Sequence, residues 1–485
     1  SQGFAENRTA MLAQINELRG LENMIRARSE KSRERFQSRN QLLPRDRLEL
    51  LLDRGASWLE LSTTAGYKTY DDDGGENISG ARLITGIGVV SGVRCVVVVD
   101  DSGILAGALH THGVDKMNRA FDLALENRLP VIHLVQSAGA DLMDYVPATW
   151  VRAGGMFYKQ AKLSASGCPV ISVVHGSSTA GGAYMPGMSD YVVMVRNQAT
   201  AFLAGPPLVR AATGEIAEAE ELGGTNMHAS ISGLTEYVAE DDPQALAICR
   251  DIVGRLNWQK RLAPSIEQPW DEPAYDIDEL CGIVSTEYQK PYDVREVIAR
   301  LVDGSCFLEF KAEYDTQTIC GQAAIMGFPC GLIGNNGPIT PHGATKATQF
   351  MQLCDQSDTP LIYLMNTTGF IVGRDAEEGG MIKHGAKMIQ AVSNIAVPRI
   401  TLMIGASFGA GAYAMSGWSY EPRFLLGWPN ISAGVMGAKQ AALVMRIVYE
   451  AKADRQGEPL DQAEWDIIEK KVIDLYGASE NGYYY

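Results

Sequence analysis

The sequence lacks the marks of a zinc-ribbon, secreted or membrane protein. Its eight cysteines form no Cys-x-x-Cys pair, which excludes a zinc ribbon and a thioredoxin-like redox motif, and no metal is expected on the chain. Eight thiols in 485 residues do not make a disulfide scaffold. A reducing compartment fits them, the cytoplasm or, in a eukaryote, the mitochondrial matrix. No apolar run approaches the ~20 residues of a membrane span, and no secretory signal opens the chain.

Positive charge is also scarce. The chain carries 42 lysines and arginines against 58 aspartates and glutamates, a formal net charge of −16. This balance argues against nonspecific binding to nucleic acid or anionic lipid, although a local basic pocket for an anionic ligand remains compatible with it. No Gly-x-x-x-x-Gly-Lys-Ser/Thr motif is present, so no ATP-binding phosphate loop is expected.

Glycine and apolar residues are abundant. Hydrophobic residues make up 46% of the chain and charged residues 21%, which is typical of a globular protein. The 50 glycines exceed the average share of ~7% and predict many tight turns and close backbone approaches. A length of 485 residues exceeds one ordinary core and predicts about two to four units.

The chain begins with an expected helical arm over residues 1–55. Leu12, Ile15, Leu18, Leu21 and Ile25 follow a helical spacing, while Pro44 and Gly55 interrupt the pattern. This pattern favours an amphipathic arm for packing or oligomerisation, and the alternative is a basic binding helix. After Ile84, β-branched runs alternate with helical segments, as in an α/β protein.

Two domains with this alternation of strands and helices are separated by a polar, proline-containing linker. The expected boundaries are 56–265 for the first domain, 266–291 for the linker and 292–485 for the second domain. Landmarks of the first domain recur in order in the second. Their offsets are 360 − 130 = 230 for Pro130 and Pro360, 398 − 169 = 229 for Pro169 and Pro398, 411 − 182 = 229 for Gly182 and Gly411, and 346 − 116 = 230 for Lys116 and Lys346. One offset kept this closely predicts an internal duplication of an α/β domain of roughly 200 residues.

Each half contains a strand that runs into a glycine-rich turn before a helix. The two segments are Val173–Tyr184 and Leu402–Tyr413. Glycine lets the backbone turn sharply and lets a ligand approach the main-chain N–H groups, and a helix N-terminus favours negative charge. The repeated turn therefore predicts two anion or oxyanion sites, whereas a single such turn serves packing more often than function.

The second turn also contains Gly405-x-Ser407-x-Gly409, the pattern of a serine hydrolase elbow. In that enzyme class the histidine base follows the serine in the chain. All seven histidines precede Ser407. A serine hydrolase is therefore disfavoured.

At these residues the chain resembles the carboxyltransferase subunits of biotin-dependent acyl-CoA carboxylases, most of all the methylcrotonoyl-CoA and geranyl-CoA β subunits. The resemblance runs from about Arg45 to near the C-terminus, and its most specific stretches are Phe202–Glu215 and Thr368–Arg374. It implies two tandem crotonase-fold (ClpP/crotonase) α/β domains. It also implies transfer of a carboxyl group from carboxybiotin to an acyl-CoA through an enolate held in oxyanion holes.

The resemblance also implies roles for particular residues. Gly181 and Gly182 would hold the thioester oxygen of the acyl-CoA, and Gly411 and Ala412 the ureido oxygen of biotin. Further contacts to acyl-CoA are implied at Ala106, Gly107, Ala108, Lys116, Ala183, Tyr184, Ala204, Gly205 and Pro206. For Lys116, a solvated helix face is an equal alternative. Contacts to biotin or the acyl group are implied at Gly369, Phe370, Val372, Gly373, Tyr413 and Ala414.

A partner follows from what the chain lacks. No Ala-Met-Lys-Met biotin attachment site is present, so biotin and the biotin carboxylase activity are expected on a partner subunit. Family members pair the two domains head to tail in a homo-hexamer. No protein base is expected either, since the biotin enolate left by loss of CO2 can accept the substrate proton.

Departures from the family leave the acyl group open. Ala138 stands where the methylcrotonoyl enzymes carry glycine, the loop over 141–146 is shorter, and Ala412 and Ala414 replace Asn and Gly. The main alternative is a biotin-dependent decarboxylase or transcarboxylase with the same half-reaction. A crotonase-type hydratase would need carboxylates beside Gly182, where there are none. A noncatalytic scaffold subunit is disfavoured by the intact glycines in both halves.

Overall fold

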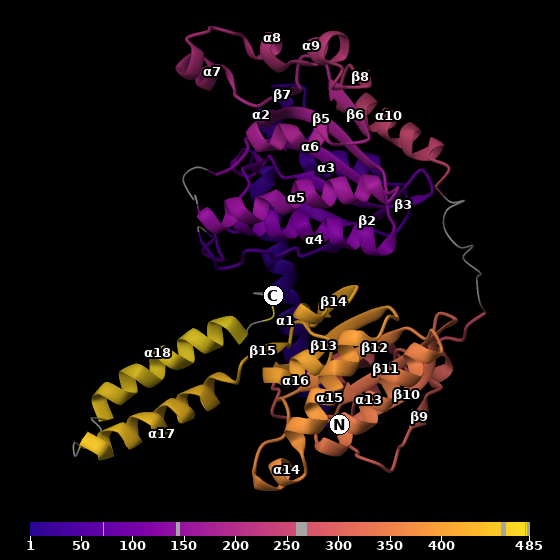
Figure 1. Cartoon of the computed structure of the whole chain (residues 1–485), viewed down its shortest axis with the longest axis vertical. Helices are drawn as coiled ribbons and strands as arrows, with labels where there is room; N and C mark the ends of the chain where they lie inside the picture. Colours follow the sequence, from indigo (N-terminus) through magenta and orange to yellow (C-terminus); the bar gives the residue numbers. More distant parts are fainter. Residues whose placement is uncertain (71, 142–145, 259–268, 457–461, 481, 483–485) are drawn as a thin grey trace. The chain divides into compact units, whose positions relative to one another are not determined.

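The computed structural model describes residues 1–70, 72–141, 146–258, 269–456, 462–480 and 482. The chain divides into two compact units, one of Arg19–Ser265 and one of Ser1–Leu18 with Ile266–Tyr485 (Figure 1). Residues 142–145 of the expected short loop and 266–268 of the expected linker lie outside the described part. No helix in the described part is long and apolar enough to cross a membrane.

The unit of Arg19–Ser265, hereafter the N-terminal unit, is built on an eight-stranded sheet in the order β1-β2-β3-β4-β5-β6-β8, with β7 paired to β5. β1, β2 and β3 are antiparallel, and the pairs from β3 to β8 are parallel. The run Val96–Val99 is at most 1% exposed, which explains why a continuous β-branched segment forms a central strand. The strands are Leu59–Leu61, Leu83–Val90, Val93–Asp100, Val131–Ser137, Val170–Thr179, Tyr191–Val195, Thr200–Phe202 and Tyr237–Ala239 for β1 to β8.

Helices pack against the sheet and against one another in this unit. α4 and α5 pack side by side in front of the sheet in Figure 1, and α10 packs beside α3 and against β5, β6 and β8. The α-helices are α2 Arg33–Gln37, α3 Pro44–Leu51, α4 Thr111–Asn127, α5 Pro147–Ala165, α6 Tyr184–Gly187, α7 Pro206–Thr213, α8 Ala219–Gly223, α9 Thr225–Met227 and α10 Asp242–Arg255. The short helical turns are η1 Gly80–Arg82, η2 Leu105–Gly107, η3 Ala180–Ala183 and η4 His228–Ser232.

The second unit, hereafter the C-terminal unit, repeats the arrangement with a seven-stranded sheet in the order β14-β13-β12-β11-β10-β9, and β15 pairs with β13. Its strands are β9 Leu308–Phe310, β10 Thr318–Ile325, β11 Phe328–Asn335, β12 Leu361–Thr367, β13 Arg399–Phe408, β14 Phe424–Gly427 and β15 Ser432–Gly434. Its α-helices are α11 Leu280–Ile283, α12 Val294–Ile298, α13 Pro341–Gln356, α14 Arg374–Glu378, α15 Met381–Asn394, α16 Gly409–Ala414, α17 Ala438–Gln456 and α18 Gln462–Glu480. Within the range expected to be a linker, α11 forms and Val284 is fully buried, so these residues belong to the core of this unit.

The sheet registers confirm the duplication. Val131 of β4 pairs with Val170 of β5, and Leu361 of β12 pairs with Arg399 of β13, at offsets of 361 − 131 = 230 and 399 − 170 = 229. Both pairs of strands carry a register shift at the equivalent place, just before Ser137 and just before Thr367. The two α/β halves therefore share one strand arrangement, as the sequence predicted.

The halves differ between the first hairpin and the helix that follows it. Asp100 ends β3 and α4 begins at Thr111, a step of 11, whereas Asn335 ends β11 and α13 begins at Pro341, a step of 6. The extra residues of the N-terminal unit contain η2, Leu105–Gly107. The insertion lies at the segment for which acyl-CoA contacts were predicted.

The expected helical arm is three helices rather than one. The long helix α1, Gln2–Glu30, ends before α2, and α3 begins at Pro44, whose fixed φ and missing N–H suit the first helical turn. The start of α1 contributes Met11, 3% exposed, to the core of the C-terminal unit. Its end belongs to the N-terminal unit, where Ile25 is buried and Ser29 Oγ donates to Asp101 Oδ1 at 2.5 Å.

Candidate functional site

The glycine turn of the N-terminal unit is open. β5 ends at Thr179, Ala180 has a left-handed φ of +56°, and Gly181 is exposed. A Cβ built on Gly182 would meet only Ser178 Oγ, at 3.7 Å, and one on Gly181 only the Phe157 ring, at 3.6 Å. Packing within the chain therefore does not require glycine at either position, and the turn is open enough for a ligand to approach its backbone.

The edge that follows β3 is strained. Leu105, Ala106 and Gly107 have consecutive φ values of +44°, +53° and +65°. The left-handed region costs a non-glycine residue on the order of 1–2 kcal/mol and is enriched at ligand-binding sites. A Cβ on Gly107 would lie 2.7 Å from the Gln136 carbonyl oxygen, so only glycine fits there.

Hydrogen bonds fasten this edge to the end of β4. The Ser137 hydroxyl donates to the Gly107 carbonyl at 2.7 Å, and the Ala138 N–H donates to the Ala106 carbonyl at 3.1 Å. On the other side of Ala138, Gly139 has a φ of +91°, and a Cβ there would lie 3.2 Å from the Thr179 carbonyl oxygen. The loop after β4 thus contacts the edge 106–108 on one side and the start of the glycine turn on the other.

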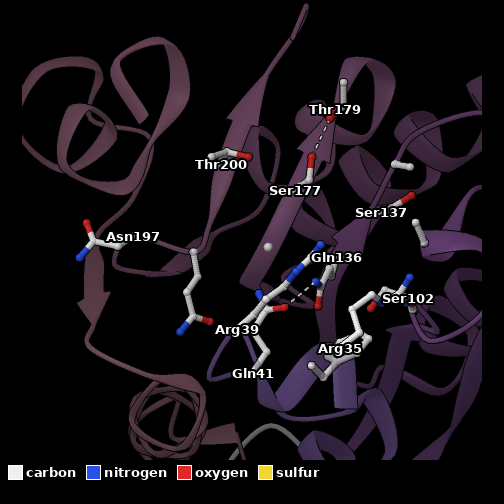
Figure 2. A pocket seen from close by; sticks show the side chains of 15 residues that line it. Arg35, Arg39, Gln41, Ser102, Gln136, Ser137, Ser177, Thr179, Asn197 and Thr200 are labelled. Carbon is white, nitrogen blue, oxygen red and sulfur yellow. Dashed lines mark hydrogen bonds between the residues drawn. The ribbon is translucent and has the colours of Figure 1, made fainter. Parts of the chain in front are cut away.

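A cleft of about 510 Å³ opens over these three segments. Its lining includes Ala106 from the strained edge, Ser137 and Ala138 from the loop after β4, and Thr179 from the start of the glycine turn (Figure 2). The remaining lining residues are Arg35, Phe36, Arg39, Gln41, Ser102, Gln136, Gly176, Ser177, Asn197, Gln198 and Thr200. The structure therefore brings the predicted residue Ala106 to the same cleft as the segment that leads into Gly181.

Two arginines of the arm line the cleft. In Figure 2, Arg35 and Arg39 lie towards the end away from Thr179. Arg35 Nη2 donates to Ser32 Oγ at 3.1 Å and to the Ser102 carbonyl at 3.2 Å, and both arginines are exposed. Guanidinium groups suit phosphate oxygens in geometry and charge. The sequence interpretation missed both residues because it favoured packing for the arm, although the basic-helix alternative contained the signal.

A buried polar network lies beneath the cleft. His175 Nδ1 and Asp242 Oδ1 are 2.7 Å apart, Arg47 Nε donates to Asp242 Oδ2 at 2.9 Å, and Arg47 Nη1 donates to Gln136 Oε1 at 2.6 Å. Gln136 Nε2 donates in turn to Gln41 Oε1 at 3.3 Å. The network thus fixes two side chains of the cleft lining, Gln136 and Gln41.

Burial sets the charges of this network. Burial, with the nearby Arg47 charge, lowers the pKa of His175 to about 4, so the imidazole is neutral at physiological pH. Burial alone would raise the pKa of Asp242, but hydrogen bonding to His175 and the charge of Arg47 bring that pKa down to about 2. The network therefore holds one carboxylate against one guanidinium beside a neutral histidine.

The glycine turn of the C-terminal unit is packed more tightly. A Cβ on Gly411 would lie 2.7 Å from the Gly369 Cα, so these two predicted residues meet backbone to backbone. Ala412 is half-buried and Tyr413 is 50% exposed. Phe370 forms a bridge with Ile339 beside the turn, Gly373 precedes α14, and Val372 between them is 85% exposed.

Both turns continue into short helices. α6 has four residues and α16 has six. A macrodipole builds up over many aligned peptides, so its expected contribution is small here and the individual N–H groups are the relevant donors.

Two predicted contact residues lie inside their units. Lys116 is 7% exposed, and its ammonium donates to the Gly80 carbonyl at 3.1 Å and the Leu83 carbonyl at 2.6 Å. Neither the expected contact to CoA phosphates nor the solvated helix face matches this placement. Ala414 is fully buried, and its side chain packs in the core of the C-terminal unit.

The remaining predicted residues flank the first turn. Ala183 is 9% exposed, while Tyr184 is 50% exposed and lies edge-on to Phe157 with ring centroids 6.1 Å apart. Ala204 and Gly205 follow β7, and Pro206 begins α7. β7 pairs with β5 through Thr179 and Phe202, which places this segment next to the glycine turn.

Comparisons with known proteins identify the family of the chain. The family model "Carboxyl transferase domain" matches residues 35–484. The geranyl-CoA carboxylase β subunit of P. aeruginosa, a solved structure, is 48% identical with a TM-score of 0.91, and the match covers 99% of this chain and 89% of that one.

Curated sequences give the same result. A probable biotin-dependent acyl-coenzyme A carboxylase β2 subunit of Mycobacterium tuberculosis is 49% identical over 89% of this chain and 80% of its own length. A probable mitochondrial methylcrotonoyl-CoA carboxylase β chain of Drosophila melanogaster is 43% identical over 100% of this chain and 86% of its own length. Together with the duplicated crotonase-like units, these matches show that the chain belongs to the carboxyl transferase family, among the β subunits of biotin-dependent acyl-CoA carboxylases.

Proposed function

We propose that the N-terminal unit binds the acyl-CoA, with the thioester oxygen held by the amides of Gly181 and Gly182 and by the edge Ala106–Ala108. The observation that carries this assignment is the open turn, where a Cβ on Gly182 would have 3.7 Å of clearance from its nearest neighbour. In the strained edge at the same cleft, the N–H groups of Gly107 and Ala108 already donate to the Ile104 and Leu105 carbonyls, so the Ala106 N–H is the donor assigned to the thioester oxygen there. Fixed backbone donors of this kind stabilise an enolate without reorganisation.

The two arginines at the cleft are assigned to the phosphates of coenzyme A. Arg35 and Arg39 are the cationic side chains of its lining, and the chain as a whole has a net charge of −16. A local pair of guanidinium groups therefore offers an anion a site that the rest of the surface does not favour. We expect Arg39→Gln to raise the KM for acyl-CoA without lowering kcat, because the phosphates are bound equally in the ground and transition states.

The C-terminal unit is assigned to biotin. Gly411 and Ala412 occupy the positions equivalent to Gly182 and Ala183, at the offset 411 − 182 = 229, and Gly369, Phe370, Val372, Gly373 and Tyr413 flank them. When bound, carboxylated biotin from a partner subunit supplies the CO2 and, after losing it, a base for the substrate proton. The residues of this chain then orient the two reactants, hold the developing negative charge and exclude water.

A second copy of the chain is part of this proposal. Tyr184 and Tyr413, at equivalent positions of the two turns, are each 50% exposed, and Trp150 and Val372 are 71% and 85% exposed. Large apolar side chains gathered beside a predicted site suit a surface that another protein covers. We therefore propose a homo-hexameric core, which binds a biotin carboxylase and a biotin carrier subunit. Mass photometry measures the size of this core.

The first experiment is a reverse half-reaction with free biotin. The chain is incubated with malonyl-, methylmalonyl-, methylglutaconyl- and carboxygeranyl-CoA, and biotin-dependent decarboxylation is measured for each. Activity with one of them establishes the transfer and identifies the acyl group. No turnover with any ester that binds would contradict the proposed activity on this panel and support a scaffold role.

A further inference from the structure

A left-handed turn before β2 is held by a buried lysine. Gly80, Ala81 and Arg82, the residues of η1, have φ values of +55°, +64° and +55°. Two of the three are not glycine, so the turn persists only because its surroundings stabilise it. The Lys116 ammonium donates to the carbonyls at both ends of the turn, Gly80 at 3.1 Å and Leu83 at 2.6 Å.

The turn directs the side chain of Arg82 into the N-terminal unit. This side chain is 1% exposed. Arg82 Nη1 donates to Asp141 Oδ2 at 2.6 Å and to the Ala108 carbonyl at 3.2 Å. A buried guanidinium is costly unless it is paired and hydrogen-bonded, and Asp141 provides the opposite charge.

These two partners belong to the two segments that border the cleft. Ala108 ends the strained edge, and Asp141 lies in the loop that follows β4, whose last residue is Ser137. Between them, the Leu109 N–H donates to the Gly139 carbonyl at 2.8 Å, and the Asp141 N–H donates to the Leu109 carbonyl at 2.9 Å. The Arg82 guanidinium adds a side-chain clamp to this short backbone ladder.

The C-terminal unit has the ladder but not the clamp. There the Ile339 N–H donates to the Gly369 carbonyl at 2.9 Å, and the Ile371 N–H donates to the Ile339 carbonyl at 2.9 Å. The position equivalent to Asp141 is Ile371, at 371 − 141 = 230, and the one equivalent to Arg82 is Gln317, at the hairpin offset 317 − 82 = 235. Since the ladder forms without an ion pair in one half, the fold alone does not require it in the other.

We propose that Arg82 and Asp141 form a positioning clamp that fixes the amide edge 106–108 against the loop 137–141, and so sets the geometry of the thioester site and of the adjoining acyl wall. The inference rests on the proposed acyl-CoA site in the N-terminal unit. Neither residue is assigned a contact to the substrate. Lys116 supports the clamp by holding the turn from which Arg82 extends.

The test compares Arg82→Gln, Asp141→Asn and the double variant in the assembled protein. Each single variant is expected to lose ~10–100-fold in kcat/KM for acyl-CoA, since a displacement of about 1 Å at a reacting group has effects of this size. The KM for free biotin, whose proposed site lies in the C-terminal unit, is expected to stay at the wild-type value. The double variant is expected to lose no more than the worse single variant, because the two residues act as one unit.

A second readout separates positioning from stability. The ratio of kcat/KM between a short and a long acyl-CoA is expected to shift in Arg82→Gln, since Asp141 lies in the loop that borders the acyl group, and Arg82→Lys is expected to restore part of the activity. Arg300→Gln is the matched control. Arg300 is also a largely buried, doubly ion-paired arginine, bonded to Glu279 and Glu296 in the C-terminal unit, and its loss is expected to lower the melting temperature without moving the acyl-CoA ratio.

The outcomes distinguish the clamp from the proposed function. If the wild-type protein transfers carboxyl groups while Arg82→Gln keeps its kcat/KM and its acyl-CoA ratio, the clamp is refuted and the proposed function stands. If Arg82→Gln changes the KM for biotin and for acyl-CoA equally, the effect is general and the clamp is again refuted. A wild-type protein without transfer activity would overturn the proposed function instead.

Discussion

At the scale of single residues, equivalent glycines of the two turns have different reasons to be glycine. Gly411 is required by packing, because a Cβ there would lie 2.7 Å from the Gly369 Cα, whereas a Cβ on Gly182 would make only an ordinary contact of 3.7 Å with Ser178 Oγ. The sequence shows the same pattern at both positions. Only the structure separates a glycine that packing requires from one that packing does not require.

This difference makes Gly182→Val a direct test of the thioester site. The added Cβ would meet Ser178 Oγ at an ordinary contact distance of 3.7 Å, so the melting temperature and the oligomeric state are expected to stay near those of the wild-type protein. The carboxyl transfer rate is expected to fall at least ~100-fold, the size of effect seen when one oxyanion donor is lost. Transfer is measured with the acyl-CoA identified by the panel.

Gly20→Val is the control for this variant. A Cβ on Gly20 meets nothing within 4 Å, and the residue lies in α1 rather than at the cleft. It is expected to remain active. Full activity in Gly182→Val would remove that residue from the site, and a loss of assembly in Gly182→Val alone would show that the turn serves packing.

Ala412 gives a second prediction at this scale. It is half-buried beside Gly411, so replacement by Leu is expected to reduce the space at the proposed biotin site. The KM for free biotin should rise ~10-fold or more, while the KM for acyl-CoA changes little, as measured by varying each substrate in turn. If the KM for acyl-CoA rose instead and the KM for biotin changed little, the acyl-CoA site would be assigned to the C-terminal unit and the biotin site to the N-terminal unit.

The sequence predicts the position of a residue well where strand order determines it, and poorly where a long side chain finds partners far away in the sequence. The placement of Ala106 and the Thr179–Gly182 segment at one edge follows from strand order, which the duplicated pattern contains. The environment of Lys116 does not follow from strand order. Its four-carbon stem reaches carbonyls 36 and 33 residues away, and no local spacing encodes such a partner.

At the scale of elements, a buried carboxylate connects β5 to α10 beneath the cleft. His175 comes from β5, Asp242 is the first residue of α10, and Arg47 belongs to α3. Three elements far apart in the sequence are thus joined by one carboxylate. Single-sequence patterns identify each element but not this pairing, because a lone histidine in an apolar strand is equally consistent with a simple core position.

The network predicts a specific acid sensitivity. The pKa of His175 is about 4 in the folded protein and 6.5 for the free side chain, so between these values the unfolded chain binds a proton that the folded one does not. Stability therefore falls as the pH falls from 6.5 to 4, by about 1.4 kcal/mol per pH unit and ~3 kcal/mol in all. Asp242, with a pKa lowered to about 2, adds a second loss below about pH 4.

His175→Gln is expected to remove the first of these losses and leave the second. The measurement is the melting temperature of the wild-type protein and the variant from pH 7 to pH 4. The curves should converge as the pH falls, because only the wild-type protein loses the histidine contribution. Parallel curves over this range would show that His175 does not titrate in the unfolding reaction.

At the scale of the whole molecule, the architecture is a duplicated α/β unit preceded by a helix that contributes to both copies. The offset of 229 to 230 predicts the parallel strands and the helices between them, and the registers confirm it. The hairpin offset of 235 does not follow from the repeat, because the extra residues around η2 interrupt it. Patterns repeated in a sequence are thus the best predicted parts, and segments unique to one half, such as η2 and the clamp, are the least.

The shared helix α1 yields a prediction about how the units depend on it. Met11 is 3% exposed in the core of the C-terminal unit, whereas Leu12, its neighbour on the same helix, is 39% exposed. Truncation of a buried methionine leaves a cavity, so Met11→Ala is expected to cost ~2–5 kcal/mol, and Leu12→Ala less than about 1 kcal/mol. Hydrogen exchange in Met11→Ala should become faster in α12, whose Val297 and Ile298 share that core, while β4 of the N-terminal unit keeps its protection. Equal acceleration in both units would mean that they unfold as one cooperative body, and no acceleration in α12 would place Met11 outside the core that stabilises the C-terminal unit.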